Sequence, residues 1–255
     1  MSMLFAKALA TPPILFADEQ PQRLCQQRPP HGLLGSGNHS GVVLLSECVS
    51  LVTELQASAR NGSTRPALPD ASSSCAVVGN SGTLFESGLG RHVDSHAHVL
   101  RFNAAPSGGV WEHDVGQKST VRILSAWVAQ MRTRHPADTR SSGDAVLLYC
   151  RLLSYKCLRA AVSPPGKGQL VRRWLVNPLF VAEINAELHR LQDELHQHEP
   201  QLATRRSALP STGIVGVALA LSTCARVSLL GFGNASAASP SSSACSPSPG
   251  PQSAQ

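Results

Sequence analysis

Two asparagines in this chain have the surroundings of a ligand-binding site. Asn80 lies in the turn GNSG, directly after the apolar run 75–78, and Asn103 ends the segment HVLRFN. A side-chain amide offers both a hydrogen-bond donor and an acceptor, and Gly79 and Gly82 allow a ligand to approach the backbone closely. Open α/β sheets bind ligands at the carboxyl ends of their strands. The turn lacks the Gly-Lys-Ser/Thr ending of a P-loop, and taken alone it favours an ordinary strand-to-helix connection over a ligand site.

The sequence PSTG is a second candidate, because it precedes the apolar run 213–225. Ser211 or Thr212 is suited to cap a helix there, and Gly213 is the first residue of the run. Free amides and hydroxyls at a helix start also bind phosphate or carboxylate. N-caps are common, so PSTG by itself favours a structural cap over a ligand site.

A D-x-H-x-H pattern is formed by Asp94, His96 and His98. Such a pattern at a strand end can bind a metal, as in metal-dependent amidohydrolases. That hypothesis requires further ligands on later strands of a barrel, and the chain after residue 103 is too short for eight strand–helix units. The simpler interpretation is that the two histidines flank a strand.

Apolar runs predict strands and helices that alternate along most of the chain. Short runs of the kind buried in parallel sheets predict strands at 75–78, 98–103, 120–124, 145–149 and 227–232. Helical periodicity predicts helices at 42–59, 177–198 and 213–225. Strands separated by helices indicate an α/β fold, with a mostly parallel sheet flanked by helices on both faces.

Composition divides the chain into three parts. Residues 1–74 predict an irregular segment with one helix and a linker, and residues 75–233 predict an α/β domain. Residues 234–255 are rich in Ser, Pro and Ala and predict a disordered tail. No stretch is long and apolar enough to span a bilayer, so the chain is expected either to be soluble or to lack its anchor.

The charge and the cysteines narrow the class of partner. A formal net charge of +6 suits an anionic partner, but no block of Lys and Arg lies beside aromatic residues, so nucleic acid is not expected. The seven cysteines form no CxxC pair, which disfavours a zinc site, and their spacing leaves disulfides and free thiols both open. Asn-x-Ser glycosylation sequons occur at Asn38, Asn61 and Asn234, and they are informative only if the chain enters the secretory pathway.

In combination the motifs are far more specific than any of them alone. Their order is CAVVGNSG, then D-S-H-x-x-V-L-R-x-N, then D-V-G-x-K at 114–118, PSTG, and G-F-G at 231–233. This order resembles the animal-type sialyltransferase family: Cys75 to about Thr120 is similar to its large sialyl motif, and Ser207 to Gly233 to its small one. The resemblance implies a Rossmann-like glycosyltransferase fold, a GT-A-like variant. It also implies transfer of sialic acid from CMP-sialic acid to a glycan of a glycoprotein or glycolipid.

The resemblance assigns roles to single residues. Those that would bind the CMP-sugar donor are Asn80, Asn103, Ser211, Thr212 and Gly213. A disulfide would join Cys75 to Cys224. The family resemblance further implies a Golgi location, and neither a metal nor another cofactor.

One part of the family's pattern is not found in this sequence. The family's general base is a His in a His-x4-Glu segment beyond the small motif, yet after Gly233 the chain holds no His, Tyr or Glu. We therefore expect a donor-binding region that is incomplete at its catalytic end. A catalytically inactive module that binds a CMP-sugar or a partner protein is the alternative.

Overall fold

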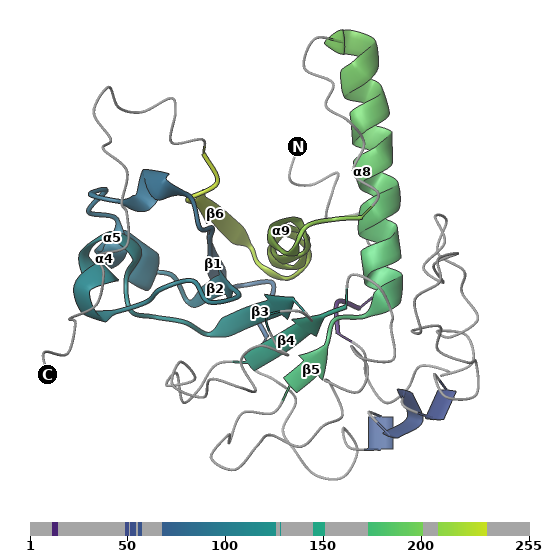
Figure 1. Cartoon of the computed structure of the whole chain (residues 1–255), viewed down its shortest axis with the longest axis horizontal. Coiled ribbons are helices and arrows are strands. Elements are labelled where there is room, and N and C mark those ends of the chain that lie inside the picture. Colours follow the sequence, from purple (N-terminus) through teal and green to yellow (C-terminus); the bar gives the residue numbers. More distant parts are fainter. Residues whose placement is uncertain are drawn as a thin grey trace, which may run out of the picture.

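Parallel strands form the centre of this computed structural model. The structure describes residues 12–14, 49–50, 52–54, 56–57, 68–125, 128, 145–150, 173–200 and 209–233. Its strands are β1 (Ser74–Val78), β2 (His98–Phe102), β3 (Val121–Ser125), β4 (Ala145–Tyr149), β5 (Arg173–Leu175) and β6 (Arg226–Leu230). They lie in the order β5-β4-β3-β2-β1-β6, and every neighbouring pair is parallel. Of the described strands, the last along the chain, β6, therefore lies beside the first, β1 (Figure 1).

Helices cover both faces of the sheet. They are α4 (Gly90–Asp94), α5 (Glu112–Val115), α8 (Pro178–His198) and α9 (Thr212–Thr223). Successive side chains of a strand point to opposite faces, so Cys75 and Val77 of β1 enter the core shared with α8 and α9. Ala76 and Val78 enter the second core, shared with α4 and α5. In Figure 1 α4 and α5 lie together, well away from α8 and α9. The expected α/β fold with helices on both faces is confirmed.

The long helices begin where their sequences predict. The side chain of Asn177 accepts a hydrogen bond from the Leu179 N–H at the start of α8, where Pro178 fits because the first turn needs no donor. Ser211 caps α9 by accepting from the Ile214 N–H at 3.3 Å. The helix expected at 42–59 is described only in part, and its described residues, within 49–57, are helical.

Several short elements were not predicted from the sequence. They are β5, α4, α5, and the 3-10 helices η1 (Gly82–Leu84) and η2 (Gly109–Trp111). Each spans at most five residues, too few for periodicity to be visible, so tertiary packing rather than local pattern stabilises them. One example is Gly90, where an added Cβ would lie 1.9 Å from the carbonyl oxygen of Glu112, because α4 packs directly against α5.

The region before β1 contributes to the main core. Ile14 is fully buried in it and pairs with Val176 through an isolated antiparallel bridge. The predicted tail 234–255 lies outside the described residues, as do the sequons at Asn38, Asn61 and Asn234. Among the helices in the described part of the chain, none has the length and apolar character needed to cross a membrane.

Candidate functional site

The GNSG turn and the G-F-G segment lie side by side at the carboxyl ends of β1 and β6. The Gly79 N–H donates to the carbonyl of Leu230 at 2.8 Å, and the Ser81 N–H donates to that of Gly231 at 3.0 Å. The Ser81 hydroxyl donates to the carbonyl of Gly233 at 2.5 Å. Two segments far apart in the sequence thus form one corner of the sheet.

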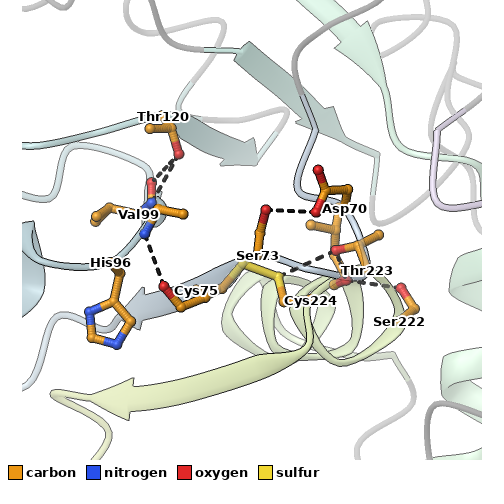
Figure 2. Close-up of a disulfide and its surroundings, with 12 residues drawn as sticks. Asp70, Ser73, Cys75, His96, Val99, Thr120, Ser222, Thr223 and Cys224 are labelled. Atoms are coloured by element: carbon orange, nitrogen blue, oxygen red, sulfur yellow. Dashed lines mark hydrogen bonds between the residues drawn. A yellow bond between two sulfur atoms is a disulfide. The ribbon is translucent and has the colours of Figure 1, made fainter.

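A disulfide joins the same two regions at the opposite end of the sheet. Cys75 at the start of β1 is bonded to Cys224, which follows α9, with a Cα–Cα distance of 6.1 Å (Figure 2). This is the pairing that the resemblance implies. Helix α9 therefore runs back along β1, with its end linked to the strand's start and its own start near the strand's end.

A pocket of about 380 Å³ opens beside the GNSG turn. Its wall is formed by the ends of β1 and β2 and by the segments that follow them: Val78, Gly79, Asn80, Ser81, Gly82, Leu84, Phe85, Asn103, Ala104, Ala105, Pro106, Trp111, Asp114 and Val115. No lysine or arginine belongs to this wall, and Asp114 is its charged side chain. Apolar groups with a few amides and hydroxyls are the usual lining of a small-molecule site.

Asn80 and Asn103 both lie in the wall of this pocket. Asn80 is exposed, and none of the described residues forms a hydrogen bond with its side-chain amide. The amide oxygen Oδ1 of Asn103 accepts from the Ser125 N–H at 2.9 Å. This bond fixes the orientation of the Asn103 amide and leaves Nδ2 as a donor that no described residue uses. The two asparagines can therefore present hydrogen-bonding groups to one ligand.

Ser211, Thr212 and Gly213 do not belong to the pocket wall. The ring of Phe232 lies between them and the GNSG turn, since a Cβ added to Gly79 or to Gly213 would lie 3.3 Å from that ring. The start of α9 therefore adjoins the pocket, with Phe232 in between. Tyr149 also holds the start of α9 in place, because its buried hydroxyl donates to the carbonyl of Pro210 at 2.7 Å.

A sequence model described as glycosyltransferase family 29 (sialyltransferase) matches residues 21–244. The chain belongs to this sialyltransferase family. It is similar to beta-galactoside alpha-2,6-sialyltransferase 2 of Pan troglodytes, at 28% identity over 167 residues that cover 60% of this chain and 30% of that protein. It is also similar to CMP-N-acetylneuraminate-beta-galactosamide-alpha-2,3-sialyltransferase 1 of Homo sapiens, at 33% identity over 169 residues that cover 62% of this chain and 44% of that protein. The match spans less than half the length of either relative.

Solved structures agree with this family at the level of the fold. A mammalian sialyltransferase in complex with Gal-beta-1-3GalNAc-ortho-nitrophenol superposes with a TM-score of 0.56 at 24% identity, covering 90% of this chain and 79% of that chain. A second crystal structure of a mammalian sialyltransferase gives a TM-score of 0.54 at the same identity. The family and the fold that the motif order implied are both confirmed.

In this sialyltransferase fold the D-x-H-x-H residues have structural partners. The Asp94 carboxylate accepts from the Gln117 and Lys118 N–H groups at 3.0 and 2.8 Å. His96 is buried, and its Nε2 lies 2.8 Å from the hydroxyl of Ser228. His98 begins β2, and burial, followed by the nearby Lys118 charge, lowers its pKa. Within the described ranges no group of three potential ligands is positioned to hold a metal, so nothing in this pattern favours the metal-hydrolase hypothesis.

Asp114 is a wall residue that the sequence marked only as part of the D-V-G-x-K motif. Its carboxylate accepts from the N–H groups of Glu86 and Gly88, each at 3.0 Å, and lies 3.1 Å from Nδ1 of His113. Glu86 and Gly88 both have left-handed φ angles, 56° and 66°. The bond from Gly88 first, and those from Glu86 and His113, hold the pKa of Asp114 below its ordinary value. Asp114 therefore fixes the turn that closes one side of the pocket.

Asp114→Asn is expected to reduce the acid sensitivity of the fold. Because folding lowers this pKa, the carboxylate stabilises the folded chain above its ordinary pKa of 3.8, and the stabilisation is lost as the pH falls through the lowered value. Asparagine has no carboxylate to protonate, so the variant lacks this stabilisation at every pH. Its melting temperature should therefore fall less than that of the parent between about pH 6 and pH 3. Thermal melts across this range test the prediction, and equal acid dependence in both proteins contradicts it.

Proposed function

We propose that the pocket binds CMP-sialic acid and that the chain is the donor-binding part of a sialyltransferase. In this proposal the enzyme transfers sialic acid to a glycan of a glycoprotein or glycolipid in the Golgi. The disulfide between Cys75 and Cys224 is consistent with that location, because disulfides persist in the oxidising secretory pathway. The proposal needs no metal ion.

The observation that carries the proposal is the placement of Asn80 and Asn103 in one pocket. They follow β1 and β2, which are adjacent parallel strands, and the order of strands in the sheet reverses at β1. Open α/β sheets bind nucleotides outside the carboxyl ends of their strands, in the region of such a reversal, and the pocket lies there on the β2 side of β1, next to the crevice between β1 and β6. The Nδ2 donor of Asn103 and the free amide of Asn80 suit the phosphate oxygens and the polar edge of cytidine.

Ser211, Thr212 and Gly213 are proposed to meet the donor where it leaves the pocket. In the first turn of α9 the Ile214 N–H donates to Ser211, whereas no described residue accepts from the N–H groups of Thr212 and Gly213. These N–H groups and the positive end of the helix dipole attract phosphate. The ring of Phe232, 44% exposed, separates this turn from the pocket wall. A donor that reaches both must therefore pass along the exposed side of Phe232.

Sialyl transfer also requires a base to take the proton from the acceptor hydroxyl while CMP leaves. None of the pocket-wall residues is a histidine, and the Asp114 carboxylate is already occupied by backbone N–H groups. The proposal for this region is therefore donor binding. A transfer assay with CMP-sialic acid and a galactose-terminated acceptor, run beside the binding measurement, tests catalysis separately.

Asn80→Ala and Asn103→Ala should each weaken CMP binding to the full chain. Each loses a hydrogen bond to a charged or polar group of the ligand, worth about 1–2 kcal/mol, which corresponds to roughly a 5- to 30-fold higher Kd. Isothermal titration calorimetry with CMP measures the change.

Two controls make the titration specific. Gln117→Ala removes an exposed side-chain amide that is not part of the wall and should leave the Kd unchanged. Asn80→Asp keeps the side-chain shape but places a negative charge near the phosphate, so it should weaken binding more than alanine does. Parental affinity in both alanine variants rules out the proposed donor site.

A further inference from the structure

Arg122 lies directly behind the pocket wall without forming part of it. Its side chain is 7% exposed and extends from β3 toward the segment that follows β2. Nη1 donates to the carbonyl oxygens of Asn103 and Ala105, at 3.1 Å each. Both acceptors belong to residues that line the pocket, so the guanidinium holds the pocket wall from its inner side.

These bonds hold Asn103 in an unfavourable backbone conformation. Its φ angle is 48°, in the left-handed region that residues other than glycine adopt uncommonly, asparagine more readily than most. Such conformations persist only where surrounding contacts impose them. The Asn103 N–H donates to the carbonyl of Ile123 and its Oδ1 accepts from the Ser125 N–H, at 2.9 Å each. With the Arg122 bond, every one of these contacts comes from β3.

The neighbouring arginine on β2 supports a different part of the same segment. Arg101 is the register partner of Arg122 and is fully buried. Its guanidinium donates to the carbonyls of Pro106, Val115 and Lys118, at 3.4, 2.6 and 3.0 Å. Arg101 thus supports the far side of the pocket wall, while Arg122 supports the turn that carries Asn103.

We propose that Arg122 is a positioning residue for nucleotide binding: it fixes the Asn103 turn so that Nδ2 points at the ligand. The inference rests on the proposed donor site. Arg122 does not itself contact the ligand, so its effect on affinity passes through the wall residues whose carbonyls it holds, chiefly Asn103, since Ala105 offers the ligand no polar side chain. A general electrostatic effect of its positive charge on an anionic ligand would not depend on the residue at position 103.

A double-mutant cycle on CMP affinity tests this dependence. Calorimetry of the full chain compares the parent, Arg122→Met, Asn103→Ala and the double variant. Arg122→Met alone should weaken CMP binding about tenfold, comparable to Asn103→Ala. In the Asn103→Ala background the same Arg122→Met substitution should weaken CMP binding by less than a further factor of about two, because the amide that Arg122 positions is already gone.

The Asn80→Ala variant is the matched control for the Asn103→Ala background, and the effect of Arg122→Met on CMP binding is measured in both. Asn80 follows β1 and forms no hydrogen bond with Arg122 among the described contacts. Arg122→Met should therefore still weaken binding about tenfold when Asn80 is alanine. An equal loss in all backgrounds, or no loss in the parent, overturns the positioning role. If Asn103→Ala has no effect, Arg122 has no group to position and the positioning role is overturned; if Asn80→Ala has no effect either, the donor site itself is wrong, which is a separate result.

Arg122→Lys serves if the methionine variant does not fold. Lysine keeps the positive charge, but its shorter side chain does not place a nitrogen where Nη1 of Arg122 donates to both carbonyls, so it should weaken CMP binding about threefold in the parent and not at all in the Asn103→Ala background. Unchanged affinity in Arg122→Lys would show that charge alone matters and would also overturn the proposal. In either folded variant, ¹⁵N–¹H spectra should show a shifted or broadened side-chain amide signal for Asn103.

Discussion

The double variant Cys75→Ala/Cys224→Ala should lose about 4–5 kcal/mol of unfolding free energy, because the disulfide closes a very long loop. The two cysteines are 149 residues apart in the sequence, and in the chain-entropy model the stabilisation grows with the length of the loop. The loss is a large fraction of the roughly 5–15 kcal/mol that stabilises a typical domain. Urea unfolding followed by circular dichroism should show a much lower midpoint.

The double variant is preferable to chemical reduction of the parent. Cys150 is also disulfide-bonded, so a reductant breaks more than the bond of interest. A single variant leaves a thiol that can pair with other cysteines, whereas removing both avoids this. A loss of less than about 1 kcal/mol would mean that contacts between β1 and α9, rather than the cross-link, stabilise this arrangement.

Gly79→Ala should disrupt the corner where β1 and β6 end. A Cβ at this position would lie 2.2 Å from the carbonyl oxygen and 2.9 Å from the carbonyl carbon of Gly231. Both are backbone atoms, so relief requires the strand ends to separate, which strains the bond from the Gly79 N–H to Leu230. We expect a loss of at least about 2 kcal/mol in stability. CMP affinity should fall about tenfold or more, because Asn80 moves with the turn.

Gly233→Ala is the matched control at the same corner. The nearest atom to its added Cβ is a methyl carbon of Thr83, at 3.3 Å. A side chain can adjust where a backbone carbonyl cannot, so this variant should stay within about 0.5 kcal/mol of the parent. Thermal melts and CMP titrations of both variants measure the contrast. If Gly79→Ala behaves like Gly233→Ala, the close approach of the two strands is not needed for the fold.

The sequence predicts the main strands and the long helices well, because each carries a dense local signal. AVLLY at 145–149 is a run of apolar residues, and α8 begins at an Asn-Pro pair that both caps and starts the helix. The segment Arg173–Leu175 was missed because three residues show no period, and its strand geometry depends on pairing with β4. The end of β6 was placed too late, since the left-handed φ of 71° at Gly231 ends the strand.

For the candidate site, the order of the motifs along the chain predicts more than the chemistry of single residues does. The sequence identifies Asn80 and Asn103 as polar residues at strand ends, and the structure places both on one pocket. It gives no indication that Phe232 separates the start of α9 from that pocket, or that Arg122 holds the Asn103 carbonyl. Those facts depend on the twist and packing of the sheet. An arginine in an apolar run has no local pattern that reveals which carbonyls it will reach.

The pairing of β6 with β1 has a consequence for folding while the chain is synthesised on the ribosome. β1 is an interior strand, yet the neighbour on one of its sides is translated only after β5, α8 and α9. At ordinary synthesis rates one edge of β1 stays open for roughly 10–30 seconds. During that time Cys75 is a thiol without its partner, and an open strand edge invites wrong pairing. Efficient folding in cells should therefore depend on chaperones and a disulfide isomerase that protect the early strands until β6 arrives.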